Sequence, residues 1–106
     1  KFFLGTDTAP HFASDKENCC GCAGIFNATY CISILAQIFD NKNSINMLED
    51  FVSKNGAKHY NLKFNKEKIK LIKSKKRLMF KKFINIKKER VKIFEPDFSV
   101  FWQINI

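Results

Sequence analysis

The most constraining feature of the sequence is a short apolar run, Phe2-Phe3-Leu4, that ends abruptly in Gly5-Thr6-Asp7. A strand with consecutive apolar residues is buried on both faces, as in a parallel sheet. Such a strand needs neighbours on both edges to pair its backbone groups. Because the first residue is Lys1 rather than Met and the strand-like run follows at once, we expect the chain to be a piece of a longer protein.

A long stretch without sustained periodicity follows the apolar run, from Thr8 to Gly24. Loops longer than about 12–15 residues inside compact domains are usually functional. The order of strand, long loop and helix is that of a βα unit, and in barrels of such units the chemistry lies on the loops after the strands. We therefore expect the α/β class, with the last βα unit of a larger barrel and a C-terminal extension after it.

Two helices are expected downstream of the loop. The first carries a wide apolar stripe over residues 28–39, which predicts a heavily buried helix. The second starts at Ser44, a favourable N-cap residue, and is expected to end at Lys54-Asn55-Gly56. The stripe of the first helix consists of Ala28, Ile32, Leu35 and Phe39.

Beyond Leu62 the pattern changes to alternating apolar and polar residues, which is typical of strands with one wet face. The alternating segments are 69–71, 83–86, 91–93 and 100–106. We expect two regions. Residues 1–62 would hold the last βα unit with its long loop and the following helix, and residues 63–106 would form a Lys-rich C-terminal extension of short strands.

The net charge of +9 comes entirely from the second region. Residues 1–62 hold five basic and six acidic side chains, whereas residues 63–106 hold fourteen basic and four acidic ones. Seventeen of the nineteen basic residues are Lys, while groove readers and phosphate clamps favour Arg. We expect a solvated lysine face and no nucleic acid, with a basic nucleic-acid-binding module as the alternative. No apolar run approaches the roughly 20 residues of a membrane helix, so no membrane is expected.

Four cysteines, a number sufficient for two disulfides or a metal cluster, stand in the first half of the chain. Zinc sites usually take two C-x2-4-C pairs separated by a loop, whereas here three thiols crowd into four residues. Small packing side chains are the favoured interpretation, and a Cys-metal module is an alternative. The cysteines are Cys19, Cys20, Cys22 and Cys31.

Asp7 and His11 are the first candidates for chemistry. A carboxylate at the tip of a buried strand is where barrel enzymes place a metal ligand or general base, although an Asp that caps the next turn explains it equally well. His11 could present an imidazole to the same site or simply lie exposed on the loop. The turn 21–24 brings small residues and backbone N–H groups next to a helix N-terminus, which favours anions, but a tight turn that needs glycine is the simpler explanation. His59 has no companion ligand nearby and is expected to be structural or exposed.

Specific residues now point to a known family. The match is dense over residues 1–28 and looser through 51–60. It resembles the C-terminal signature of the homodimeric bacterial-type dihydroorotases, members of the amidohydrolase superfamily. The residues that carry the resemblance are Phe2-Phe3-Leu4-Gly5-Thr6-Asp7-Thr8-Ala9-Pro10-His11, Lys16-Glu17 and Cys20-Gly21-Cys22-Ala23-Gly24-Ile25-Phe26-Asn27-Ala28.

The resemblance implies the C-terminal part of a (β/α)8 TIM barrel with two zinc ions, Zn2+, bridged by hydroxide and a carboxylated lysine. It implies a zinc-dependent cyclic amidohydrolase of de novo pyrimidine (UMP) biosynthesis, which interconverts N-carbamoyl-L-aspartate and (S)-dihydroorotate plus water. A cytoplasmic homodimer is implied as well. Asp7 falls on the family's aspartate that binds a zinc ion and shuttles the proton. His11 and Ala23 fall on positions that contact the substrate carboxylate, Ala23 through its backbone.

The remaining zinc ligands of the family come from earlier strands and cannot be found here. They are a His-x-His pair, the carboxylated lysine and two further histidines, whereas this chain holds only His11 and His59. We therefore expect the chain to be inactive alone and to depend on the missing N-terminal part of the same enzyme.

Overall fold

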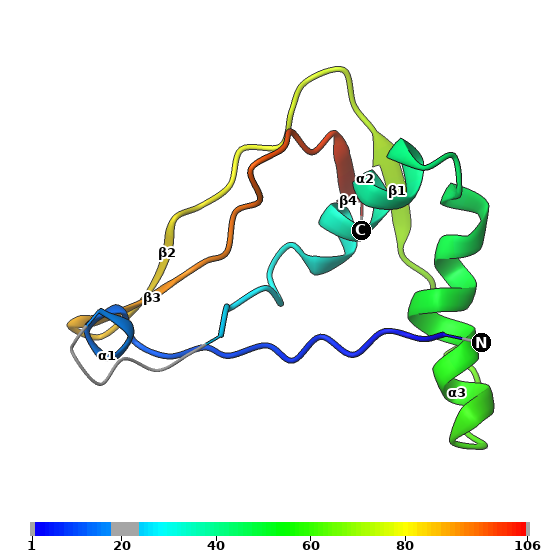
Figure 1. Ribbon diagram of the computed structural model, residues 1–106, viewed down its shortest axis with the longest axis horizontal. Coiled ribbons are helices and arrows are strands. Elements are labelled where there is room, and N and C mark those ends of the chain that lie inside the picture. The colour runs from blue at the N-terminus through cyan, green and yellow to red at the C-terminus, as the bar shows by residue number, and fades with distance from the viewer. Residues whose placement is uncertain (1, 18–23, 106) are drawn as a thin grey trace. The chain divides into compact units, whose positions relative to one another are not determined.

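A computed structural model describes residues 2–17 and 24–105 (Figure 1). These residues mix short helices and short strands, and they divide into two compact units that each combine separate parts of the sequence. Unit 1 comprises the residues up to Gly5, Ile32–Leu78, and the residues from Val100 onward. Unit 2 comprises Thr6–Cys31 and Met79–Ser99. In the part of the chain that the structure describes, no helix is both long and apolar enough to cross a bilayer.

The main helix of unit 1 is α2 (Cys31–Asn41), which corresponds to the helix predicted over 28–39. Its buried face differs from the predicted stripe, because Ala28 is exposed in the turn before the helix and Gln37 is buried. The Gln37 side chain is satisfied there: its Oε1 accepts a hydrogen bond from the Phe101 N–H at 2.9 Å, and its Nε2 donates one to Asn41 Oδ1 at 2.8 Å. A polar side chain that keeps its hydrogen bonds can be buried at little cost.

The second predicted helix is a continuous run of three types of helical turn: η1 (Ile45–Met47), η2 (Asp50–Lys54) and α3 (Asn55–His59). The predicted stop around Gly56 is wrong, since this glycine lies inside α3. A Cβ at Gly56 would lie 3.3 Å from a ring carbon of Phe3. The absence of a side chain at this position therefore serves close packing against Phe3 rather than the end of a helix.

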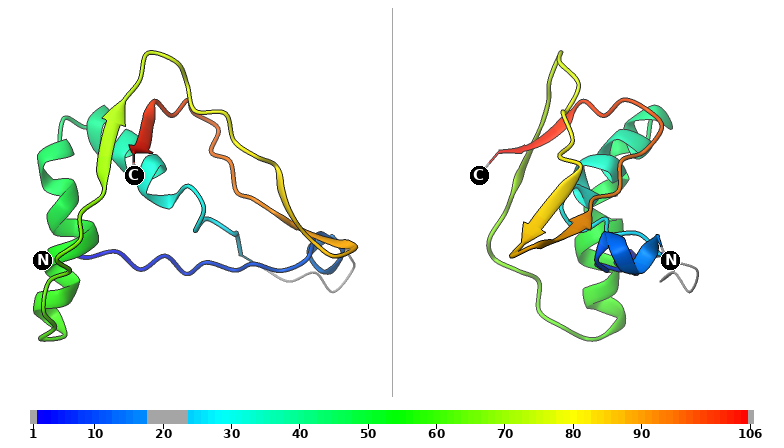
Figure 2. Two further views of the ribbon diagram at one scale, coloured as in Figure 1. Left: turned by 180° about the vertical axis from the view of Figure 1, so that it is seen from behind. Right: turned by 90° about the vertical axis from the view of Figure 1, so that its left-hand side faces the viewer.

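Each of the four strands overlaps one of the four predicted alternating segments, and only β2 has the predicted bounds. In unit 1, β1 (Lys70–Lys73) pairs with β4 (Trp102–Asn105) in an antiparallel sheet of two strands. In unit 2, β2 (Phe83–Ile86) and β3 (Glu89–Lys92) form an antiparallel hairpin (Figure 2). The boundary predicted between 62 and 63 stays a prediction.

The strand predicted at Phe2–Leu4 is not present, because residues 2–11 contain neither helix nor strand. Instead, this segment is held by the second helical run. The Leu4 N–H donates a hydrogen bond to Phe51 O at 3.0 Å, and the Asn55 side chain donates one to Phe2 O at 2.9 Å. Among the described residues no neighbouring strand pairs with the segment, so the ladder that a buried parallel strand requires cannot form.

Unit 2 packs the β2–β3 hairpin against the N-terminal segment that carries the candidate residues. Phe12, just before α1 (Ala13–Lys16), forms an antiparallel bridge with Val91, and Phe26 forms a parallel bridge with Ile93. Val91 and Ile93 are both nearly fully buried. The Lys-rich part of the chain thus supplies two of the buried residues of unit 2, beside Ala13 of α1.

Candidate functional site

Asp7 has the most unusual backbone among the residues singled out from the sequence. Its φ angle is +46°, in the left-handed region that costs non-glycine residues about 1–2 kcal/mol. The side chain is exposed, and no described residue forms a hydrogen bond or ion pair with its carboxylate. Strained conformations persist only where the surroundings determine them, and they gather at functional sites.

Three hydrogen bonds hold the residues around Asp7 to the segment 24–27. The Asn27 side-chain Nδ2 donates to Thr6 O at 3.0 Å, and the Asn27 backbone N–H donates to Thr8 Oγ1 at 3.2 Å. The Ala9 N–H donates to Ile25 O at 2.7 Å. The residues on both sides of Asp7 are therefore tied to Asn27.

Gly24 lies at the start of the described part of this second segment, close to Ala9. Its φ angle is +96°, and a Cβ built on it would lie only 2.7 Å from Ala9 Cβ. Both features exclude a side chain at this position, so the glycine permits the close approach.

His11 is exposed and follows a tight turn at Pro10, in which the His11 N–H donates to Ala9 O at 3.0 Å. A three-residue turn of this kind suits the fixed φ of proline. Asp7 and His11 thus belong to one short segment of unit 2, and the turn presents the imidazole to solvent. Ala23, the third predicted site residue, lies outside the described residues.

Metal-ligating side chains do not cluster in the described residues. Within 2–17 and 24–105, no three His, Cys, Asp or Glu side chains gather closely enough to hold a metal ion. Cys31 is half-buried, and burial raises the pKa of its thiol, which disfavours the thiolate that binds metals. Cys19, Cys20 and Cys22 lie outside the described residues, so the Cys-metal alternative stays a hypothesis.

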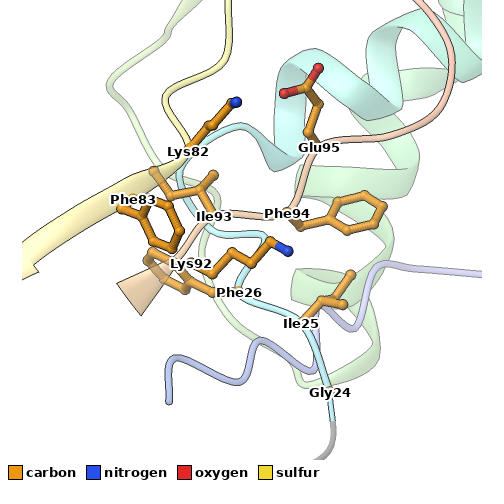
Figure 3. Close-up of a pocket in the computed structure, with 9 residues that line it drawn as sticks. All are labelled: Gly24, Ile25, Phe26, Lys82, Phe83, Lys92, Ile93, Phe94 and Glu95. Atoms are coloured by element: carbon orange, nitrogen blue, oxygen red, sulfur yellow. The ribbon is translucent and has the colours of Figure 1, made fainter. Parts of the chain in front are cut away.

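Unit 2 also has an open depression of about 660 Å³ between the hairpin and the segment 24–26 (Figure 3). Lys82, Lys92 and Glu95 stand among phenylalanine and isoleucine side chains around it. The Phe94 N–H donates to Phe26 O at 2.9 Å and closes one wall. Neither Asp7 nor His11 lines the depression.

Comparison with known proteins identifies the family that these residues resemble. No family model matches the chain. The dihydroorotase of a Ruegeria species is 40% identical over 104 residues, which is 98% of this chain and 30% of that protein. The dihydroorotase of Agrobacterium fabrum is 41% identical over 105 residues, 99% of this chain and 30% of that protein. That of Neisseria gonorrhoeae is 51% identical over 73 residues, 69% of this chain and 21% of that protein.

Two solved structures agree with these sequence matches. The structure of dihydroorotase from Saccharomyces cerevisiae in complex with 5-fluoroorotic acid superimposes with a TM-score of 0.83 at 30% identity, over 98% of this chain and 30% of that one. Dihydroorotase from Campylobacter jejuni gives a TM-score of 0.76 at 28% identity, over 98% and 29%.

Over nearly its whole length this chain is similar to one part of these dihydroorotases. These matches cover nearly the whole of this chain but only about three tenths of the length of the dihydroorotases. The resemblance inferred from residues 1–28 is thereby confirmed, and the similarity extends beyond residue 60 through the Lys-rich region.

Sequence reasoning missed Asn27 as a residue of the site. In the sequence it is one position of the dihydroorotase-like stretch that ends at Ala28. The hydrogen bond from its side chain to Thr6 O spans 21 positions in sequence, a separation at which local patterns carry no signal.

Proposed function

We propose that this chain is the C-terminal part of a dihydroorotase that interconverts N-carbamoyl-L-aspartate and (S)-dihydroorotate plus water, in the α/β architecture of a (β/α)8 barrel. The observation that carries the proposal is the match to dihydroorotases over nearly the whole chain, in sequence and in structure. The yeast dihydroorotase of known structure was captured with 5-fluoroorotic acid, a carboxylated pyrimidine, which supports a substrate of the same chemical class.

We propose that Asp7 binds a metal ion and also transfers the proton. Its carboxylate is exposed and without a described partner, so both oxygens are available, and carboxylate oxygens are accepted zinc ligands. Asp7 would be this chain's contribution to a site for two Zn2+ whose other ligands, including the carboxylated lysine, lie outside this chain. When bound, the metal ions would polarise the substrate carbonyl and lower the pKa of the attacking water.

In the hydrolytic direction the Asp7 carboxylate accepts the proton that the attacking water loses as its oxygen adds to the amide carbonyl carbon. Asp7 then delivers that proton to the ring nitrogen as the C–N bond breaks, and its side chain becomes a carboxylate again. The synthetic direction reverses both transfers. A single carboxylate held at a fixed place suits such a shuttle, because proton transfer requires hydrogen-bond reach.

His11 and Ala23 are assigned to the substrate carboxylate. The exposed His11 imidazole on the Pro10 turn can donate a hydrogen bond to an anion. Ala23 would donate its backbone N–H to the same carboxylate. We further propose that the whole enzyme is a cytoplasmic homodimer, that residues 63–106 are its C-terminal extension, and that the remaining barrel strands are its N-terminal part.

The test uses the complete polypeptide that the source gene encodes, purified with zinc. Conversion of dihydroorotate to N-carbamoyl-L-aspartate should be measurable in both directions. Asp7→Ala should abolish turnover in both directions, because the shuttle and one metal ligand are lost together. Asp15→Ala is the matched control, since Asp15 is an exposed aspartate of α1 on the same loop and should leave turnover unchanged.

Near-normal activity of the Asp7→Ala variant would refute the role of Asp7. A complete polypeptide that binds zinc but converts neither compound would refute the proposed function itself. An intact mass for that polypeptide equal to the 12.4 kDa of this chain would instead require a second chain to supply the missing strands.

A further inference from the structure

The strained Asp7 lies between two residues that are both bound by Asn27. Thr6 accepts a hydrogen bond through its carbonyl and Thr8 accepts one through its hydroxyl, at 3.0 and 3.2 Å. Asn27 thus forms hydrogen bonds to the residues on both sides of Asp7. The carboxylate itself receives no hydrogen bond from any described residue, so these contacts fix the backbone and leave the side chain free.

The left-handed conformation of Asp7 needs such a constraint. A φ angle of +46° is less favourable for aspartate than the extended or right-handed region, so hydrogen bonds to its neighbours help to keep Asp7 in this conformation. Relaxation would rotate the Cα–Cβ bond and carry the carboxylate away from its present direction. The two Asn27 bonds oppose that rotation from opposite sides of the residue.

The surroundings of Asn27 specify an amide at this position. Its Nδ2 donates to Thr6 O, while its Oδ1 is buried and accepts no hydrogen bond from any described residue. An aspartate here would place a second oxygen against the Thr6 carbonyl oxygen and bury a charge, both of which are unfavourable. The side chain therefore works as a donor.

We infer that Asn27 is a positioning residue for Asp7: through its side chain and its backbone N–H it holds Asp7 in the left-handed conformation that directs the carboxylate. The inference deepens the proposed function and rests on it for the role of the carboxylate. Removing a residue that orients a metal ligand without itself touching the metal typically lowers metal affinity or activity about 10–100-fold.

The experiment compares Asn27→Ala with Asn55→Ala in the complete polypeptide. Asn55 is a close match, because its Nδ2 donates to another backbone carbonyl of the same N-terminal segment, Phe2 O, at 2.9 Å. That carbonyl lies in unit 1 and does not flank Asp7. The readouts are zinc bound per chain after dialysis, kcat, KM and the urea midpoint.

Asn27→Ala should lower kcat about 10–100-fold and weaken zinc retention while KM stays within about twofold. Asn55→Ala should shift the urea midpoint by a similar amount and leave zinc and kcat as in the wild type. Wild-type zinc content and kcat in a folded Asn27→Ala variant would overturn the inference, although the proposed function would stand. If the wild type does not hydrolyse dihydroorotate, the zinc comparison alone decides the inference.

A second pair of variants guards against an Asn27→Ala protein that does not fold. Thr8→Val removes the acceptor of the Asn27 N–H, whereas Thr8→Ser keeps it. Thr8→Val should lower kcat and zinc retention, and Thr8→Ser should restore both. Equal zinc content and equal kcat in the two Thr8 variants would overturn the inference.

Discussion

The backbone N–H of Lys81 donates a hydrogen bond to the phenolic oxygen of Tyr30, 51 residues earlier in the chain, at 3.1 Å. The Tyr30 ring also lies 4.5 Å from the ring of Phe80, centroid to centroid. These contacts attach the Lys-rich part of unit 2 to the end of the segment that carries the candidate site. The Lys-rich part of unit 2 therefore helps to support that segment.

Replacing Tyr30 by phenylalanine should lower the free energy of unfolding by about 0.5–1.5 kcal/mol, the usual net value of one hydrogen bond. The ring contact with Phe80 would be kept, so the change isolates the hydroxyl. Urea denaturation of the complete polypeptide measures the difference. Tyr60→Phe is the control, because Tyr60 is 64% exposed and its contacts are made by the ring, to Phe3 and His59. Equal stability losses in the two variants would contradict the role of the Tyr30 hydroxyl.

Gly24→Ala should destabilise the complete polypeptide by about 1–3 kcal/mol, because alanine is strained at positive φ and its Cβ would collide with Ala9 Cβ. The double variant Ala9→Gly, Gly24→Ala removes the collision and leaves only the strained φ. It should therefore lose less stability than the sum of the two single variants. If the stability loss of the double variant equals the sum of the losses of the two single variants, Ala9 and Gly24 do not approach each other closely.

Acid should lower the stability of unit 1, because it protonates the Asp40 carboxylate. The Asp40 carboxylate accepts hydrogen bonds from Lys73 Nζ at 2.7 Å and Trp102 Nε1 at 3.2 Å, and these bonds, with the Lys73 charge, lower its pKa. A carboxyl group whose pKa is lowered by folding stabilises the fold above its unfolded pKa of about 3.9 and loses that contribution as pH falls through the folded value.

Thermal unfolding of the wild type and Asp40→Asn across the acid range checks this direction. The stability of the wild type should fall as pH drops below about 4, and the Asp40→Asn variant should show a shallower fall. Part of the dependence will remain in the variant, because Lys54 and Lys68 lower the pKa of Glu49 in the same unit. Identical pH profiles for the two proteins would contradict the assignment to Asp40.

His11→Ala should raise KM for dihydroorotate about tenfold or more with a smaller effect on kcat, since a hydrogen bond to a charged group is worth about 1.5–3 kcal/mol. His59→Ala is the matched control, because His59 is the other histidine of the chain and stacks beside Phe3 in unit 1. Steady-state kinetics of both variants measure the effect. An unchanged KM in His11→Ala would remove His11 from the substrate site.

Much of the local structure was predictable from the sequence. The alternating segments overlap β1 to β4 with ends shifted by up to two residues, and the periodic segment 28–39 became α2 with ends shifted by two or three residues. The stretch from Gly5 to Ala28 also led to the family that the comparisons then confirmed. Each of these predictions rests on residues that are close together in the chain.

The misses share one physical cause, which is contact between residues far apart in sequence. Gly56 reads locally as a helix stop, yet Phe3 packs against it inside α3. The apolar run at Phe2–Leu4 reads as a strand, yet without a neighbouring strand among the described residues it is held by Phe51 and Asn55.

The sequence by itself therefore determined the resemblance to dihydroorotases, the order of most elements and the identity of Asp7 and His11 as candidates, because composition, period and motif are properties of neighbouring residues. Only the tertiary structure decided that Asn27 binds both neighbours of Asp7, and that Val91 in β3 and Ile93 just after it are buried in unit 2. Those features depend on which distant segments meet, and side-chain donors and acceptors are paired only once they do.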